Sequence, residues 1–303
     1  MAAAGPTLVI AVPTFHRLAL LDALLDALRA QADPVGAEIL VVDNDPAGSA
    51  REVVVGRARY VVEPARGLAA VRNRALTEAA GADAVVFIDD DETPAPGWLD
   101  ALVAAWRSHG AEAVSGRVLS RFPDGFDDPW IEQGGFFVRV QFPAGAHQPV
   151  AATNNLLLDL HAVRRFGLQF DERMGLSGGE DILFTSLLVK AGGRIISAPD
   201  AVVFDDVTPE RLTHPWVLRR AYRVGISTVV TRTVVHGGLA VRLRGLAGGA
   251  ARVVVGGARW LLGWVTRAPR HAARGARAVA RGAGMMAGAL GLTYREYALR
   301  DHG

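Results

Sequence analysis

The feature that most constrains the fold is the alternation of short apolar runs with segments of helical spacing along residues 7–204. Uninterrupted runs such as TLVIAV at 7–12 and AVVFI at 84–88 are typical of strands buried on both faces of a parallel sheet. Strands alternating with helices predict an α/β chain with a doubly wound, mostly parallel central sheet flanked by helices. The expected strands are residues 7–12, 38–42, 58–62, 84–88, 113–120, 156–160, 194–197 and 201–204. The expected helices are 18–30, 98–109 and 182–191, and residues 67–80 are expected to form a loop that leads into a further helix.

Polar or conformationally special residues directly follow three of these strands. In a doubly wound sheet, ligands bind outside the carboxyl ends of the strands, so these residues are expected to meet at one edge. The sequence therefore predicts a binding site there. Its members are Pro13, Thr14 and Phe15 after the first strand, Asp43, Asn44 and Asp45 after the second, and Asp89, Asp90 and Asp91 after the fourth.

The acidic cluster Asp89-Asp90-Asp91 carries the strongest chemical signal. Three adjacent carboxylates repel one another, and a divalent cation removes that cost. Hard oxygen ligands suit Mg²⁺ or Mn²⁺, which retain waters and share their sites with substrate phosphates. A solvated acidic turn that caps the next helix is the alternative that needs no ligand.

Glu180 and Asp181 stand behind two glycines at the start of a predicted helix. The helix dipole favours an ionised acid at this position, which a general base requires. An ordinary helix cap with flanking glycines explains the same residues without chemistry. Because these acids lie far along the chain from Asp89, the sequence leaves open whether the two sites meet.

Other polar residues near the same edge carry weaker signals. Arg72 is placed to reach a diphosphate, and Gly67 allows close backbone approach, although a solvated helix face explains Arg72 equally well. Asp43 fits a hydrogen bond to a base or ribose, or an Asx turn without a ligand. The pair Asp205-Asp206 after the last strand is a further candidate for a metal ligand.

Charge divides the chain into two parts. Residues 1–210 carry 17 basic and 29 acidic side chains, whereas residues 211–303 carry 16 basic and 2 acidic ones. We therefore expect an acidic α/β domain over 1–210 and a basic helical region over 211–303, with different partners. The absence of cysteine excludes disulfides, thiolate metal sites and a cysteine nucleophile.

The basic region has an amphipathic pattern. Its arginines recur at helical spacing, which we interpret as one helical face kinked at Pro269. With neighbouring apolar and aromatic residues, this predicts a helix lying in a membrane interface, its basic face toward anionic lipid. A helical hairpin packed on the catalytic domain is the alternative, and nucleic-acid binding is not expected because no fold signature for it occurs. The arginines are Arg252, Arg259, Arg267, Arg270, Arg274, Arg277 and Arg281.

Taken together, motifs over about residues 7–210 resemble those of family 2 glycosyltransferases with the GT-A fold. The matching segments are VIAVPTFHR at 9–17, VVDND at 41–45, RGLAAVRNRAL at 66–76, VVFIDDDETPAPGWL at 85–99 and LSGGEDILFTSLLVKAGGRI at 176–195. The resemblance implies an inverting enzyme that moves a sugar from a nucleotide diphosphate sugar to an acceptor hydroxyl with Mg²⁺ or Mn²⁺. The acceptor is left open between a lipid-linked or envelope glycan and a secondary metabolite.

The resemblance also implies roles for single residues. Pro13, Thr14 and Phe15 would line the nucleotide pocket, Asp43 would contact the base, and Gly67 and Arg72 would border the ribose and diphosphate. Asp89 and Asp90 would lie beside the ribose and metal, with Asp91 as the principal metal ligand and Asp89 as the second. Glu180 would belong to the donor site, and Asp181 would be the catalytic base. Many relatives have a histidine where this chain has Asp205 and Asp206, so no third protein ligand is implied.

No signal peptide and no apolar run long enough to span a bilayer is apparent, so we expect a cytoplasmic protein at the inner face of the plasma membrane. Two other functions stay open. Asp89-x-Asp91-x-Thr93 also fits the nucleophile motif of haloacid-dehalogenase-like phosphatases, although that motif normally follows the first strand of its domain. The second is a non-catalytic, membrane-associated module that binds a nucleotide sugar.

Overall fold

The computed structural model describes residues 5–174 and 178–292. The chain divides into two compact units, the first comprising residues 1–119, 140–176 and 180–205, and the second 120–139, 177–179 and 206–303. The segment 120–139 belongs to the second unit although it precedes residue 210 in the sequence. The domain boundary at residue 210 stays a prediction.

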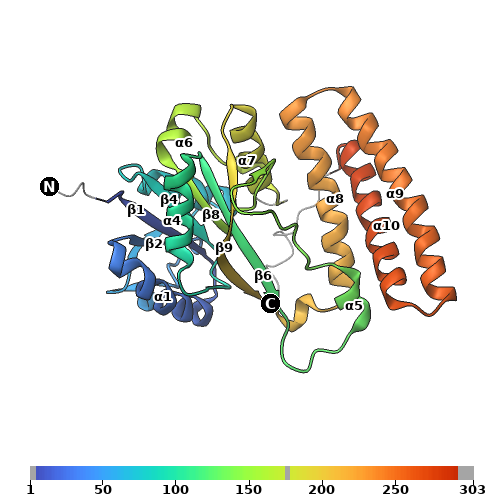
Figure 1. Cartoon of the computed structure of the whole chain (residues 1–303), viewed down its shortest axis with the longest axis horizontal. Coiled ribbons are helices and arrows are strands. Elements are labelled where there is room, and N and C mark those ends of the chain that lie inside the picture. The colour runs from blue at the N-terminus through green and yellow to red at the C-terminus, as the bar shows by residue number, and fades with distance from the viewer. Residues whose placement is uncertain (1–4, 175–177, 293–303) are drawn as a thin grey trace. The chain divides into compact units, whose positions relative to one another are not determined.

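The strands of the first unit form one sheet, seen at the centre of this unit in Figure 1. They are β1 (Leu8–Thr14), β2 (Glu38–Asp43), β3 (Arg59–Val62), β4 (Ala84–Ile88), β5 (Glu92–Pro94), β6 (Ala113–Arg121), β7 (His147–Gln148), β8 (Asn155–Asp159) and β9 (Ile195–Asp206). Over the described residues the order is β3-β2-β1-β4-β8-β6-β9-β5, with β7 beside β9. The strands from β3 to β4 are parallel, and Ile10 lies opposite both Ile39 and Val86.

Helices cover both faces of this sheet because side chains alternate between the two faces of each strand. On one face, Ile10 packs in a cluster with Leu25 of α1 and Trp98 of α4. On the other, Phe87 packs in a cluster with Phe184 of α7. The helices of this unit are α1 (Leu18–Ala32), α2 (Arg51–Val54), α3 (Leu68–Glu78), α4 (Trp98–His109), α6 (Leu160–Phe166) and α7 (Glu180–Lys190).

The sheet differs from the expected one in the direction of several strands and in the number of strands. Strand β8 runs antiparallel to β4 and β6, and β5 and β7 run antiparallel to β9. Hydrophobic periodicity carries no information on strand direction, so the antiparallel pairing of β5, β7 and β8 was not predicted. The segments 194–197 and 201–204 belong to the single strand β9, and β5 is too short to show a period.

The second unit contains α5 (Pro129–Gly134), α8 (His214–His236), α9 (Leu239–Val265) and α10 (Pro269–Ala289). The interpretation of its arginines as one kinked helical face is wrong. Helix α9 ends at Val265, and Pro269 opens α10 at a first-turn position where its missing N–H costs little. The arginines therefore lie on two helices and the turn between them. No described helix is long and apolar enough to cross a membrane.

Glycine lets α9 and α10 approach each other backbone to backbone. A Cβ at Gly249 would lie 2.7 Å from the carbonyl oxygen of Gly282, and one at Gly256 would lie 2.9 Å from that of Gly275. Residue numbers rise along α9 while they fall along α10, so the helices are antiparallel. Close packing of small residues supplies dispersion contacts, and the larger apolar side chains of α9 are not needed in this seam.

Replacing Gly256 with alanine tests the seam. The new Cβ would meet backbone atoms of Gly275 and Val279 at 2.9 Å, and the expected loss is about 1–3 kcal/mol of unfolding free energy. Gly257→Ala is the matched control, because its Cβ meets nothing within 4 Å and should be neutral or stabilise by up to about 1 kcal/mol. Urea unfolding followed by circular dichroism measures both. Equal destabilisation by the two variants would contradict the seam.

Candidate active site

Thr14 and Arg17 hold the acidic strand end. Strands β1 and β4 are paired, so the end of β1 lies beside the loop that follows β4. The Thr14 hydroxyl donates a 2.8 Å hydrogen bond to Asp90 Oδ2. One guanidinium nitrogen of Arg17 lies 2.8 Å from Asp90 Oδ1 and 2.9 Å from Asp91 Oδ2. The structure thus brings together the first and third strand-end motifs.

Arg72 of α3 joins the acidic cluster to the start of α7. Its side chain is only 3% exposed, its Nη1 donates to Glu180 Oε1, and its Nη2 lies 3.7 Å from Asp89 Oδ1. A guanidinium stays charged when buried and presents its nitrogens in a rigid fork, so it can serve two carboxylates at once. Two motifs far apart in sequence therefore meet at one site, and the solvated-face alternative for Arg72 does not apply.

Burial shifts Asp89 toward its neutral form. It raises the pKa of Asp89 to about 7, Arg72 opposes that rise, and repulsion from Asp91, Asp90 and Asp181 adds to it. The contribution of Asp181 means that the second acid of α7 also acts on this strand end. An acid with such a pKa binds a proton or a cation near neutral pH.

Two further acids are shifted in the same direction. Burial raises the pKa of Asp90 although Arg17 opposes it, and burial raises the pKa of Glu180 although Arg72 opposes it. The two arginines therefore offset only part of the cost of gathering these carboxylates. An additional cation at the cluster would be favourable.

The remaining strand-end residues lie around this cluster. Pro13 is buried within β1, whereas Phe15 is 48% exposed with its ring 4.2 Å from that of His16. Gly67 precedes α3 with a φ of 112°, a value that favours glycine, and its N–H donates to Asn44 Oδ1 at 3.0 Å. Phe15 is thus a side chain at this edge with a face free to pack against a planar ligand.

Asp181 is the second residue of α7 and is partly exposed. Its Oδ1 accepts a 2.7 Å hydrogen bond from the N–H of Ile182. The preceding Gly178 and Gly179 have φ values of 74° and 97°, so the chain enters the helix through a conformation that favours glycine. Of the motif 176–181, Leu176 and Ser177 lie outside the described residues.

Asp43 has internal partners for both carboxylate oxygens. Its Oδ1 accepts from the N–H of Asp45, and its Oδ2 accepts from the N–H of Ala50 and from the hydroxyl of Tyr60 at 2.7 Å. The side chain is fully buried. The structure therefore gives Asp43 a turn-building role, and contact with a base stays a prediction.

Arg17 and Glu92 also belong to the site, although the sequence pattern did not predict a role for either residue. Arg17 stands at a fixed short offset from Thr14, and Glu92 directly follows the acidic cluster. Glu92 is buried, and its oxygens accept from the N–H of Asp89 at 3.2 Å and from Asn154 Nδ2 at 2.5 Å. These two hydrogen bonds hold the backbone of the loop that carries Asp89, Asp90 and Asp91. By contrast, Asp206 pairs with Arg121 at 2.7 Å.

The donor atoms at this edge fit a metal that is shared with a phosphate ligand. No cluster of three or more histidine, cysteine or carboxylate side chains arranged for a metal occurs among the described residues. Mg²⁺ and Mn²⁺ do not need such a cluster, since one or two carboxylates with waters and phosphate oxygens suffice. The side chains of Asp91 and Asp89 are 12% and 35% exposed and offer hard oxygen atoms. Arg17 would share Asp91 with the ion.

The pKa of Asp89 predicts a pH-dependent affinity for Mn²⁺. Since proton and cation compete for this carboxyl, affinity should fall about tenfold per pH unit below about pH 7 and level off above it. The paramagnetic resonance signal of free Mn²⁺, recorded with a nucleoside diphosphate present, measures this affinity. Asp89→Asn should flatten the profile, and a flat profile in the unmodified chain would contradict the prediction.

Comparison with known proteins gives the site its context. A sequence profile described as "Glycosyl transferase family 2" matches residues 9–166, more than half of the chain. The succinoglycan biosynthesis protein ExoM of Rhizobium meliloti (strain 1021) is 34% identical over 195 residues, which cover 62% of this chain and 62% of that protein. The chain thus aligns with less than two thirds of the length of this relative.

Solved structures show the same fold. A mannosyltransferase from Pyrobaculum calidifontis, in complex with GDP-Man and Mn²⁺, matches with a TM-score of 0.59 and 20% identity, over 91% of this chain and 86% of that one. GalNAc-T7 with UDP, GalNAc and Mn²⁺ matches with a TM-score of 0.55 and 13% identity, over 75% and 50%. Their architecture is the GT-A fold, as expected from the motifs. On the profile match and this fold, the chain belongs to glycosyl transferase family 2.

Proposed function

We propose that this chain transfers a sugar from a nucleotide diphosphate sugar to an acceptor hydroxyl with inversion of configuration. Asp91 and Asp89 bind Mg²⁺ or Mn²⁺ in this proposal, and Asp181 is the general base. The observation that carries it is the contact of Arg72 with both Asp89 and Glu180, because it unites an acidic, cation-seeking cluster with the start of α7.

The donor half of the site is supported by charge and by the neighbouring structures. Two GT-A proteins of the same fold hold a nucleotide or nucleotide sugar together with Mn²⁺. In this chain, the exposed ring of Phe15 offers a surface for a base, and the preceding Thr14 donates a hydrogen bond to Asp90. A bound cation would neutralise the departing diphosphate. Arg17 bridges Asp90 and Asp91, and Arg72 bridges Asp89 and Glu180, so the two arginines hold these acids in place.

The acceptor half rests on Asp181. It is partly exposed in the first turn of α7, where a carboxylate can take the proton of an acceptor hydroxyl. Arg72 holds the adjacent Glu180 and so fixes the start of the helix. The freed oxygen attacks the anomeric carbon as oxocarbenium-like charge develops there, and a single attack inverts the configuration.

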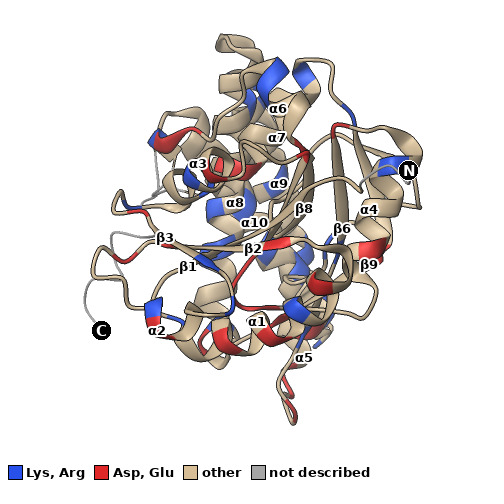
Figure 2. Cartoon of the chain, turned by 90° about the vertical axis from the view of Figure 1, so that its left-hand side faces the viewer, with Lys and Arg blue, Asp and Glu red and all other residues tan. Residues whose placement is uncertain are grey.

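The acceptor and the location are further parts of the proposal. A lipid-linked or envelope glycan, or a secondary metabolite, supplies the hydroxyl. The basic region at 211–303, which carries 16 basic and 2 acidic side chains, lies against an anionic membrane surface on the cytoplasmic side. The charge contrast with residues 1–210 supports this, and Figure 2 shows acidic positions in red along α1 and basic ones in blue on α8, α9 and α10.

Asp181→Asn tests the base. Turnover should fall about 10²–10⁴-fold while the affinity for the donor stays within about threefold, because only proton transfer is lost. Release of nucleoside diphosphate from a panel of nucleotide sugars with Mn²⁺ measures turnover, and calorimetry measures donor binding. Asp200→Asn removes an exposed acid in β9 as the matched control and should change neither.

Three results would overturn the proposal. Full turnover in Asp181→Asn would exclude this residue as the base. Hydrolysis of a phosphomonoester without binding of any nucleotide sugar would favour the phosphatase alternative. Tight donor binding with no turnover by the unmodified chain would favour the binding module.

A further inference from the structure

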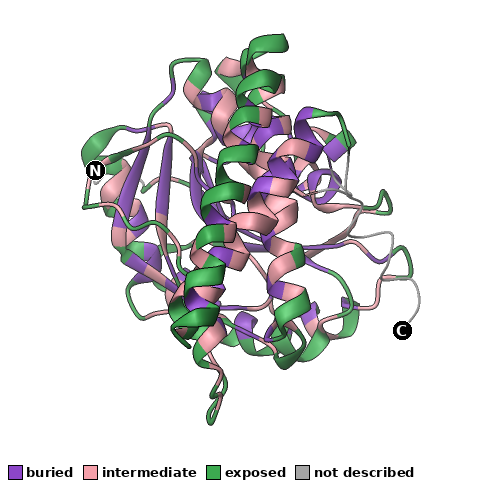
Figure 3. Ribbon diagram, turned by 90° about the vertical axis from the view of Figure 1, so that its right-hand side faces the viewer, coloured by how far each residue is buried: buried purple, intermediate pink, exposed green. Residues whose placement is uncertain are grey.

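Helix α9 is built with its large apolar side chains outward. Its seam toward α10 consists of glycines, whereas Val254, Leu261 and Val265 are 71%, 54% and 72% exposed. Figure 3 shows many exposed positions, in green, along one of the long helices that face the viewer. The exposed positions Leu243, Ala247, Ala250, Val254, Ala258, Leu261 and Val265 are spaced by three or four residues and form one stripe. An apolar stripe of this length marks an interaction surface.

The charges around the stripe favour an anionic partner. Between Glu210 and Glu296 the sequence holds no acid. Arg242 and Arg244 of α9 are exposed, and each lies about 100° around the helix from the stripe residue Leu243, one on either side of it. Burial, Arg252 and Arg232 all lower the pKa of Arg281, so further positive charges gather on the side of α9 that faces α10. Apolar area flanked by arginine matches the interface of an anionic bilayer, and no described helix could span it.

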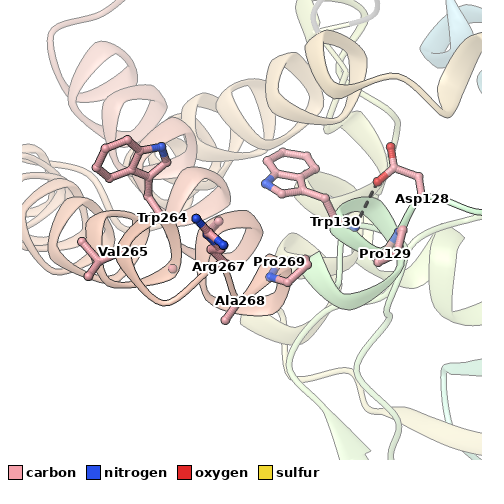
Figure 4. A pocket seen from close by; sticks show the side chains of 10 residues that line it. Asp128, Pro129, Trp130, Trp264, Val265, Arg267, Ala268 and Pro269 are labelled. Atoms are coloured by element: carbon pink, nitrogen blue, oxygen red, sulfur yellow. Dashed lines mark hydrogen bonds between the residues drawn. The ribbon is translucent and has the colours of Figure 1, made fainter.

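A groove of about 780 Å³ lies at the end of this stripe, where α9 turns into α10. It is lined by Trp264 and Arg267 from the turn and by Trp130 from α5, and Figure 4 shows the Arg267 side chain between the two indoles. Trp130 is fixed by stacking on His214 at 4.1 Å and on Phe136 at 5.1 Å. Trp264 is 73% exposed.

Arg267 is the one charge of the groove without a polar partner for its side chain among the described residues. The only other charged residue of the lining, Asp128, is already engaged, because its carboxylate accepts from the N–H groups of Trp130 and Ile131 and contacts His214 at 2.9 Å. The groove therefore combines aromatic and apolar walls with a single available guanidinium. Such a guanidinium suits a phosphate oxygen pair.

Arg267 also has an unusual backbone conformation for a residue with a side chain. Its φ is 54°, and the N–H of Ala268 bonds to the carbonyl oxygen of Gly263 while that of Arg267 bonds to Trp264. This is a Schellman motif with Arg267 at the position that normally holds glycine. Glycine would adopt this left-handed conformation at lower cost than arginine. The strained backbone therefore suggests a functional role for the Arg267 side chain.

We propose that the outer face of α9 lies in the interface of an anionic membrane and that the groove seats a lipid phosphate on Arg267 between Trp130 and Trp264. This deepens the membrane association proposed above and does not depend on the transferase chemistry. The ligand is the phosphate group of a membrane lipid whose acyl chains continue along the apolar stripe. A free phosphate lacks the chains that the apolar walls recognise.

Arg267→Gly is the sharpest test, because glycine fits the left-handed turn and the variant should unfold at the same or a higher temperature. Arg270→Ala is the matched control, since it removes another exposed positive charge three residues away within α10. Full-length proteins are floated with phosphatidylcholine vesicles with and without phosphatidylglycerol. Loss of one interfacial charge alone costs roughly fivefold in affinity. Arg267→Gly should lose about tenfold more than the control, and equal losses would overturn the lipid seat.

A second measurement locates the contact. Vesicles with brominated acyl chains should quench tryptophan fluorescence, and Trp264→Phe should remove a large part of that quenching. Undiminished quenching in this variant would overturn the placement of Trp264 in the interface. Leu261→Glu should abolish flotation. If it instead leaves flotation intact and shifts the sedimentation of a dimer to a monomer, the stripe joins two copies of the chain and the proposal fails. Failure of the unmodified chain to float would also overturn it, while the test of Asp181 would stand unaffected.

Discussion

The buried guanidinium of Arg72 is the interaction on which the site depends. A charge that is 3% exposed is tolerated only with close partners, and Glu180 and Asp89 supply them. Removing Arg72 would leave the buried Glu180 and the partly exposed Asp89 without their shared cation. The ion pair therefore fixes α7 to the strand ends, and with α7 comes Asp181. The geometry of the proposed reaction follows from one electrostatic requirement.

The second unit follows a different constraint. Where α9 meets α10, glycine occupies the seam and the backbones touch, so apolar side chains are free to point outward. The usual arrangement of an amphipathic helix, apolar side inward, is reversed. An exposed face of this kind is costly in water and favourable at a lipid surface. The same helices that complete the unit can therefore also present a surface for a membrane.

Strand runs and strand ends were readable from the sequence because burial imposes an apolar pattern. The run at 84–88 became β4 with unchanged bounds, and the acids after it lie at the predicted edge. Pattern could not reveal strand direction, which is why the antiparallel half of the sheet was missed. The pattern also could not show that Arg72 is buried. A buried, ion-paired arginine and an exposed one have the same local sequence, and only the position of Glu180 in the fold distinguishes them.

The basic region at 211–303 was the least predictable part, because its helix boundaries and contacts depend on residues far apart in the sequence. Arginine spacing alone suggested one continuous face, because Arg267 stands where glycine would have marked a helix end. The roles of Arg17 and Glu92 likewise depend on contacts across the sheet. Local sequence pattern does not reveal a residue that acts through a contact with a distant segment. It does reveal a residue whose position follows directly from the end of a strand.

The central claim is that the strand-end acids and the start of α7 form one donor and acceptor site. Anomalous diffraction at the manganese edge, from crystals grown with Mn²⁺ and a nucleoside diphosphate, tests it most directly. The account predicts one peak bonded to an oxygen of Asp91, with the diphosphate on its other side and the Asp181 carboxylate facing the same pocket. A peak away from Asp91, or a nucleotide bound where Asp181 cannot face its sugar end, would contradict the account.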